Sequence, residues 1–193
     1  MKKTLLAMAT TLLAVTAQAT VTLPSYFSDD MVVQQQSTLT VKGKASHAGT
    51  VTVNAGWTKL AYTGKTDASG NFAINVPTPK ASLKAYTITV SDGDKLTLNN
   101  VLVGEVWVCS GQSNMEMPIN GWGKVKDFEA ELKKANYNYI RLLQVKRVVS
   151  NVPTDNLILS NGEKWNVCST KSADNFSATA YFFARRLDRK SVV

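Results

Sequence analysis

The stretch Val101–Gly121, VLVGEVWVCSGQSNMEMPING, decides how the second half of this 193-residue chain is interpreted. An apolar run ends at Cys109 and gives way at once to a small, polar cluster, Ser110–Asn114, that contains one glycine. An apolar run bounded by polar turns is typical of a strand buried on both faces of a sheet. Sites in open α/β sheets lie outside the carboxyl ends of the strands. The stretch therefore predicts a strand that presents Ser113 at the rim of a sheet, although a plain strand–helix turn fits the same residues.

Between residues 20 and 100 the sequence alternates polar and apolar side chains with a period of two, and β-branched residues are frequent. This pattern is typical of half-buried β-strands. The segments that carry it are residues 37–42, 50–54, 71–76 and 86–90. Glycine, asparagine, aspartate and serine form turn signals between them, as in β-sandwiches. We therefore expect a small all-β sandwich over residues 20–100.

After residue 100 the apolar residues follow a longer period. Phe128, Leu132 and Ala135 have helical spacing and predict a helix over residues 125–136, while YIRLLQV (139–145) predicts a second strand. A further set at helical spacing predicts a helix over residues 177–190: Phe176, Ala180, Phe183 and Leu187. The order strand–helix–strand–helix favours an α/β layer with a parallel sheet over residues 101–193.

The first 19 residues have the layout of a secretory signal peptide. Two lysines, Lys2 and Lys3, precede an apolar run over residues 4–16, and Ala17-Gln18-Ala19 fits a small-x-small cleavage site. The apolar run is too short to cross a bilayer as a stable helix. We therefore expect a periplasmic or secreted protein with no membrane span after cleavage.

The net charge of +8 says little about partners, because the lysines are spread over both halves of the chain. We expect no nucleic-acid partner. Cys109 and Cys168 could form a disulfide in an oxidising compartment or stay as buried thiols, and the sequence leaves both open. Two cysteines and one histidine, His47, provide no zinc-type ligand set, and we expect no metal and no cofactor.

Ser113 has the features of a candidate nucleophile. At a sheet rim its hydroxyl would be exposed, Gly111 would permit a close turn, and backbone N–H groups could point at a developing oxyanion. A serine hydroxyl still needs a base, normally a histidine oriented by an acid. Glu116 fits a solvated carboxylate better than such an acid. Trp107 and Trp165 fit core packing better than sugar stacking.

Several strings resemble the bacterial sialate O-acetylesterases, a carbohydrate-esterase family related to the SGNH/GDSL-type hydrolases. These strings are GEVWVCSGQSNMEMP (104–118), LPSYFSDDMVVQQ (23–35), SGNFAINVPTP (69–79), KWNVCS (164–169) and NFSATAYFFARRL (175–187). The resemblance implies a flavodoxin-like, SGNH hydrolase-type fold for residues 101–193. It also implies hydrolysis of O-acetyl esters on a sugar or glycan, with acetylated sialic acid as the leading substrate.

The resemblance assigns roles to residues of the motif. Ser113 would be the nucleophile that forms an acetyl-enzyme, and its backbone N–H would be one oxyanion donor. Gly111, Gln112 and Asn114 would shape the nucleophile turn, although stabilisation of the turn alone explains the two amides equally well. Trp122, between two glycines, is a candidate platform for the sugar ring.

The chain differs from the family in the catalytic base that would activate Ser113. The family's base and acid belong to an Asp-x-x-His element far downstream, whereas His47 precedes the nucleophile and is expected on an exposed loop. Residues 187–193 do not resemble a helix that leads into another strand. We therefore expect an N-terminal fragment with an incomplete α/β domain and little or no esterase activity by itself. The alternatives are an acetylxylan or other polysaccharide esterase, and a secreted carbohydrate-binding β-sandwich module.

Overall fold

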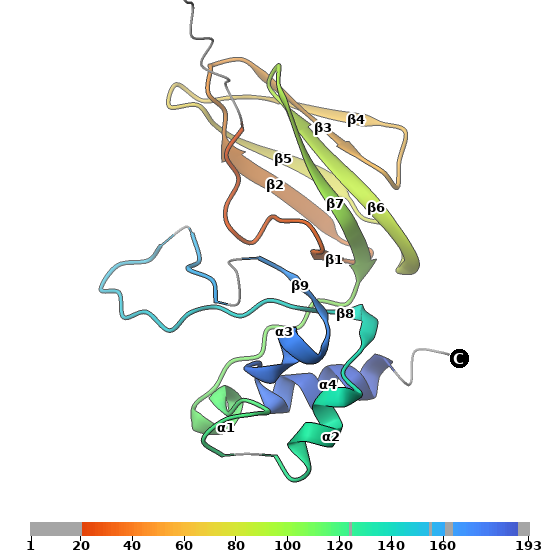
Figure 1. The fold of residues 1–193 in the computed structure, drawn as a ribbon. Coiled ribbons are helices and arrows are strands. Elements are labelled where there is room, and N and C mark those ends of the chain that lie inside the picture. Colours follow the sequence, from red (N-terminus) through yellow and green to blue (C-terminus); the bar gives the residue numbers. More distant parts are fainter. Residues whose placement is uncertain (1–20, 124, 155, 161–163, 189–193) are drawn as a thin grey trace, which may run out of the picture.

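The computed structural model describes residues 21–123, 125–154, 156–160 and 164–188. The signal peptide predicted for residues 1–19 lies outside them, as does the chain from residue 189 onward. Within the described ranges, no helix is long and apolar enough to cross a membrane. Figure 1 shows a β-rich half and a second half of short helices and short strands.

Two sheets make up the β-rich half. Its strands are β1 (Val32–Gln34), β2 (Thr38–Lys44), β3 (Thr50–Ala55), β4 (Ala61–Lys65), β5 (Asn71–Pro77), β6 (Ser82–Ser91) and β7 (Lys95–Gly104). One sheet has the order β1-β7-β6-β3-β4 and is mixed, because β1 runs parallel to β7 while the other neighbours are antiparallel. The other sheet pairs β2 with β5 in antiparallel fashion.

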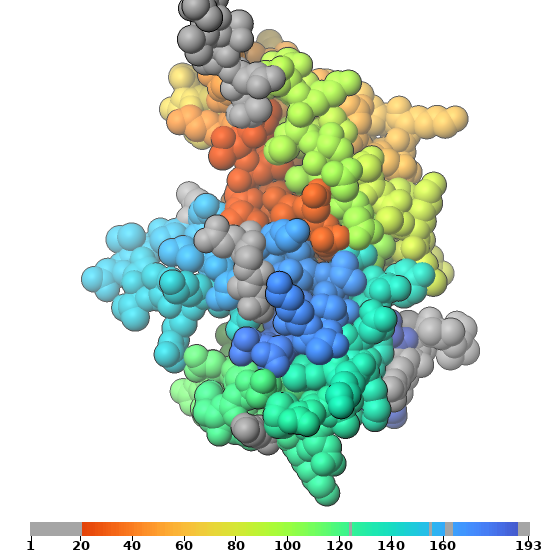
Figure 2. Space-filling model, in the orientation of Figure 1, coloured from red at the N-terminus to blue at the C-terminus, as the bar shows by residue number. Residues whose placement is uncertain are grey.

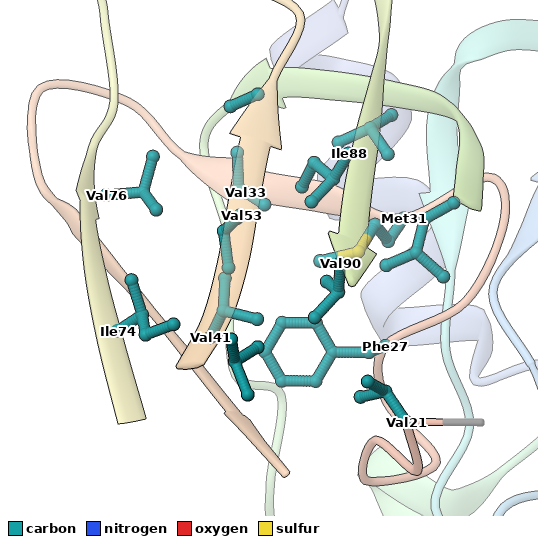
Figure 3. Packing of buried hydrophobic residues seen from close by; sticks show 14 of the residues in the cluster. Val21, Phe27, Met31, Val33, Val41, Val53, Ile74, Val76, Ile88 and Val90 are labelled. Atoms are coloured by element: carbon teal, nitrogen blue, oxygen red, sulfur yellow. The ribbon is translucent and has the colours of Figure 1, made fainter. Parts of the chain in front are cut away.

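The alternation in the sequence produces one shared core between these sheets. In β5, Phe72, Ile74 and Val76 are buried and the residues between them are exposed. Val53 of β3 and Val90 of β6 belong to the same cluster and have no exposed surface. Figure 3 shows Ile74 and Val76 on one side of this cluster and Val53 and Val90 opposite them. Burial of this apolar surface is the main stabilising contribution to this half.

The strands predicted from alternation are confirmed as β2, β3, β5 and β6. The sequence pattern missed β1, which has three residues, and β4, whose five residues include a glycine and alternate only between exposed and half-buried. Neither segment is long enough or apolar enough to stand out from the turns around it.

The prediction of one strand over residues 101–109 is wrong. β7 ends at Gly104 and pairs with β6 and β1, so Val101–Val103 are buried in the β-rich half. Residues 105–111 form no helix or strand, and Val108 is 92% exposed. The tight turn after β6 sets the antiparallel register of β7, and the sheet ends before the apolar run does.

The second half consists of short elements around its own core. These are α1 (Ser113–Glu116), α2 (Phe128–Lys133), β8 (Tyr137–Leu142), β9 (Asn166–Cys168), α3 (Thr170–Asp174) and α4 (Ala178–Asp188). Their buried cluster contains Ile119, Ala135, Cys168 and Tyr181, each with no exposed surface. The predicted helices at 125–136 and 177–190 are confirmed in shorter form as α2 and α4, and the strand predicted at 139–145 begins two residues earlier as β8.

The parallel sheet predicted for this half is not present among the described residues. β8 pairs with β9 in antiparallel fashion, and between them Val145 and Leu159 form a further antiparallel bridge. The described residues of this part of the chain therefore pair in antiparallel fashion only. A parallel pair would need a crossover connection instead. Taken as a whole, the molecule is mostly β, with a mixed sheet and few helices.

A side chain from β8 and one from the residue before β9 join the two halves. The Nη1 of Arg141 in β8 lies 3.2 Å from the Oδ1 of Asp30, and the Arg141 side chain is only 4% exposed. Burial lowers the pKa of Arg141, and the Asp30 carboxylate acts in the opposite direction. The indole Nε1 of Trp165 donates to the carbonyl of Tyr26 at 2.9 Å. Trp165 is thus partly buried against the core of the β-rich half, as the sequence predicted.

Candidate active site

Ser113 lies at the first position of α1, directly after the exposed segment 105–112. The carbonyl of Gln112 accepts from the N–H groups of Met115 and Glu116, both at 2.9 Å, and this starts the helix. The N–H groups of the first turn of any helix have no partner within it. Within the described part of the chain, the Ser113 hydroxyl is exposed and makes no hydrogen bond.

The position of Ser113 therefore differs from the prediction in one respect. It does not follow a strand at the rim of a parallel sheet, because β7 ends at Gly104, nine residues earlier. It lies instead where a loop enters a single helical turn. An exposed hydroxyl on an ordered turn remains, and that is the feature on which nucleophilic chemistry depends.

The motif is held in place by a segment about 60 residues downstream in the sequence. The Thr179 hydroxyl donates to the carbonyl of Asn114 at 2.9 Å. Pro118 and Ser177 form an antiparallel bridge, and the N–H of Ala178 donates to the carbonyl of Met117 at 2.9 Å. Figure 1 shows α1 and α4 side by side at the far end of the second half. Two of the strings that resemble the esterase family, GQSNMEMP and NFSATAYFFARRL, thus contact each other in space.

Close packing favours glycine at position 111. A Cβ placed on Gly111 would lie 3.0 Å from the Cβ of Met115, which is closer than such atoms normally approach. The prediction that Gly111 permits a close turn agrees with this distance. The Gln112 side chain forms no cap hydrogen bond, and the backbone carbonyls of Gln112 and Asn114, rather than their amides, stabilise the turn.

No base lies next to Ser113 among the described residues. His47 is exposed in the connection between β2 and β3, and its Nδ1 lies 3.0 Å from the Ser46 hydroxyl. Figure 1 shows that this connection lies at the end of the β-rich half away from α1. Glu116 forms an exposed ion pair with Arg147, at 3.2 Å, which agrees with its prediction as a solvated carboxylate.

Two tryptophans on either side of the motif are exposed. Trp122 is 68% exposed, and a Cβ at either neighbouring glycine would collide: at Gly121 with Pro118, at 2.1 Å, and at Gly123 with Met117, at 2.3 Å. The glycines therefore let the loop that carries Trp122 fold closely onto the motif. Trp107 was predicted to be a core residue, and this is wrong because it is 58% exposed. Its ring meets Phe183 edge to face, with centroids 5.1 Å apart.

The two cysteines are free thiols in this structure, which decides the open alternative against a disulfide. Cys168 has no exposed surface, and burial raises its pKa to about 11, so its thiol is neutral at pH 7. Cys109 is exposed, four residues before Ser113, so the alternative of two buried thiols is wrong for this residue. Among the described residues, no group of three histidine, cysteine, aspartate or glutamate side chains could hold a metal ion.

Sequence reasoning found the exposed serine and missed what fixes it. Thr179, Ser177 and Arg147 all contact the motif, but none of them lies in it. The string that contains Ser177 and Thr179 resembles the esterase family, and this was the one sequence signal that these residues matter. It gave no indication that they contact the motif.

Comparison with known proteins supports the resemblance. No family model matches the chain. The human sialate O-acetylesterase is 28% identical over 100 residues, which is 48% of this chain and 18% of that protein. The crystal structure of XAC1771, a carbohydrate acetylesterase from Xanthomonas citri, superposes with a TM-score of 0.78 and 31% identity. That match covers 90% of this chain and 38% of the other, so the chain spans well under half of either relative. By sequence and by fold, the chain is thus similar to sialate and carbohydrate O-acetylesterases over the part of their length that it spans.

Proposed function

We propose that Ser113 is the nucleophile of a sugar O-acetylesterase, with O-acetylated sialic acid as the leading substrate. The single observation that carries this is the Ser113 hydroxyl, exposed and without a hydrogen-bond partner among the described residues, on a turn that Thr179 holds from a distance. An exposed serine on a mobile loop would be ordinary. The backbone contacts of this turn fix the position of an exposed hydroxyl, and a nucleophile needs such a position.

The reaction proceeds in two steps. The Ser113 oxygen attacks the acetyl carbonyl, a bond forms between that oxygen and the acyl carbon, and the bond from the acyl carbon to the sugar oxygen breaks. The base passes the serine proton to the departing sugar hydroxyl. Water then attacks the acetyl-serine, acetate and a proton leave, and the hydroxyl is restored. The N–H of Ser113 is one donor to the oxyanion that develops in each step.

The neighbouring residues have supporting roles. Gly111, Gln112 and Asn114 shape the nucleophile turn. Trp122 offers an exposed aromatic face to the sugar ring, next to the turn and held close to it by its two glycines.

The base and its acid partner come from residues other than those described here. The sequence contains one histidine, and it lies at the far end of the β-rich half. We propose that this chain is the N-terminal part of a longer esterase, made of a signal peptide (1–19), a β-sandwich (20–100) and the beginning of the catalytic domain (101–193). The signal peptide would direct the protein to the periplasm or outside the cell.

There are two alternatives to a sialate O-acetylesterase. Acetylated xylan or another plant polysaccharide would use the same serine chemistry, and both relatives are compatible with an acetylated carbohydrate. A secreted carbohydrate-binding module would use the β-rich half alone and leave Ser113 without a chemical role.

The test compares this chain with the longer protein that contains it, using 4-nitrophenyl acetate and O-acetylated sialic acid as substrates. We expect little or no turnover by the 193-residue chain and clear turnover by the longer protein. Ser113→Ala in the longer protein should lower kcat by about 10⁴-fold or more. Ser110→Ala is the matched control, because Ser110 is also exposed and lies three residues away. Equal activity of the Ser113 and Ser110 variants would refute the nucleophile, and rapid serine-dependent turnover by the short chain would show that the base lies within it.

A further inference from the structure

An open groove lies where β6 of the first half meets β8 of the second. One hollow of about 260 Å³ is lined by Leu83, Asn100, Tyr139 and Arg141, among others. A second, of about 380 Å³, shares Asn100 with the first and extends to Tyr86. Figures 1 and 2 show the beginning of β6 beside β8 at the junction, away from α1. The second hollow has a volume within the range of small-molecule sites, and no residue that lines either hollow belongs to the Ser113 motif.

The floor of this groove is a fixed polar network. Arg141, with a side chain 4% exposed, pairs with Asp30 and donates from Nη2 to the Oδ1 of Asn100 at 3.4 Å. The Nδ2 of Asn100 in turn donates to the Oδ1 of Asp30 at 2.6 Å. The Nε of Arg141 is buried and has no hydrogen-bond partner among the described residues.

The rim carries side chains that are exposed and unused. Tyr139 is 51% exposed and Leu83 is 69% exposed, and together they form an apolar edge. Asn138 is exposed beside them, and neither its amide nor the Tyr139 hydroxyl makes a hydrogen bond to any described residue. Lys84 lies at the other end, with its Nζ 5.5 Å from the centre of the Tyr86 ring.

We propose that this groove is an accessory site for a saccharide. A sugar ring has an apolar face that stacks on an aromatic side chain such as Tyr139, and hydroxyls that bond to an amide such as Asn138. Lys84 is the one cation in the groove without an acidic partner among the described residues, since Arg141 is paired with Asp30. This charge favours a sugar that bears a carboxylate. The choice of a saccharide as the ligand rests on the proposed function. The existence of the groove is independent of that function.

The experiment is a calorimetric titration of the 193-residue chain with two sugars that carry no ester. Sialyllactose represents an acidic saccharide and xylotetraose a neutral one, each up to about 10 mM, which detects millimolar dissociation constants. We expect binding of sialyllactose, and Tyr139→Ala to weaken it about tenfold. Lys84→Ala should weaken the binding of sialyllactose and leave the binding of xylotetraose unchanged. This result would distinguish a site for acidic saccharides from a site for neutral ones. Trp107→Ala is the matched control, because Trp107 is similarly exposed, lines neither hollow and has no proposed contact with a sugar. Trp122→Ala tests instead for binding at the Ser113 motif.

The outcomes are distinct from those of the esterase assay. Binding of either sugar that depends on Tyr139 or Asn138 and is unchanged in Trp107→Ala supports the accessory site, even if Ser113 proves inactive. Absence of binding by both sugars overturns the proposal, and so does binding that Tyr139→Ala and Asn138→Ala both leave unchanged. Binding lost only in Trp122→Ala would place the sugar at the motif and also overturn it. Thermal unfolding of each variant shows that the exposed substitutions leave the fold intact.

Discussion

Residues 21–104 and residues 105–188 bury their apolar side chains in two separate clusters and differ in how completely they do so. In the first, alternate residues of long strands have no exposed surface, as Val51, Val53 and Val76 illustrate. In the second, elements of three to eleven residues surround a smaller cluster, and large apolar side chains such as Val108 and Val149 are more than nine-tenths exposed.

The difference concerns the half that contains the candidate nucleophile, Ser113. The β-rich half is stabilised by repeated local pairing, while the half with Ser113 depends on a few contacts between segments far apart in the sequence. Segments with few buried contacts open at lower free energy than core strands. The second half therefore offers exposed, adaptable surface around the motif, and the first half provides the rigid part of the molecule.

The largest effect should come from the core of the first half. Ile88→Ala removes a side chain with no exposed surface, and we expect the free energy of unfolding to fall by about 4 kcal/mol. Urea denaturation followed by far-ultraviolet circular dichroism measures it. Val149→Ala in the second half is the control and should change the value by less than about 0.5 kcal/mol, because Val149 is 93% exposed. Similar losses in both variants would show that the halves do not differ as described.

The junction between the halves should give the next largest effect. Asp30→Asn keeps the shape of the side chain, and asparagine tolerates the φ of 65° found at this position. The substitution removes the negative charge opposite Arg141. A buried charge that loses its partner destabilises a protein, and we expect a loss of about 3 kcal/mol because Asp30 itself is partly exposed. Glu116→Gln breaks an exposed pair with Arg147 and should cost no more than about 0.5 kcal/mol. An Asp30→Asn protein as stable as the parent would mean that Arg141 does not join the halves.

Local pattern predicted the first half well for a physical reason. A strand with one buried face must alternate, so Phe72, Ile74 and Val76 mark β5 in the sequence alone. The same reasoning failed at Val101–Cys109 because one continuous apolar run spans a buried segment and an exposed segment. The Val101–Val103 part is buried in the mixed sheet, and the Val106–Val108 part is exposed. Only the pairing with β6 and β1 separates them, and pairing is not a local property.

The candidate site shows the same limit. Ser113 could be found because a small polar cluster after an apolar run, together with the family resemblance, identifies it directly. Thr179, which fixes the turn, is 65 positions away from Asn114, the residue it contacts. The apolar spacing predicted for α4 included Phe183 and left out Tyr181, and this is wrong because Tyr181 is fully buried and Phe183 is 39% exposed. Which face of that helix packs inward depends on α1 and β8, which contact it across the fold.

A smaller effect should come from the cap of α3 in the second half. The Ser169 hydroxyl accepts from the N–H of Ser172 at 3.2 Å, and the Ser172 hydroxyl accepts from the N–H of Ser169 at 2.8 Å. Ser169→Ala removes one side of this capping box, and we expect a loss of about 1 kcal/mol in urea denaturation. Ser169→Asp keeps an acceptor and should restore most of the stability. Equal losses in the two variants would attribute the effect to packing instead of capping.

The smallest effect on stability should be at Ser113 itself. This measurement tests directly whether the Ser113 hydroxyl contributes to folding. The Ser113 hydroxyl is exposed and unbonded among the described residues, so Ser113→Ala should change the free energy of unfolding by less than about 0.5 kcal/mol. Thr179→Val is the informative control, because it removes the hydrogen bond to Asn114 and should cost about 1 kcal/mol. A serine that stability does not need, on a turn that Thr179 does stabilise, is retained for a reason other than folding. If Ser113→Ala instead destabilises the chain by more than Thr179→Val does, the hydroxyl has a structural role, and the exposed nucleophile loses its main physical support.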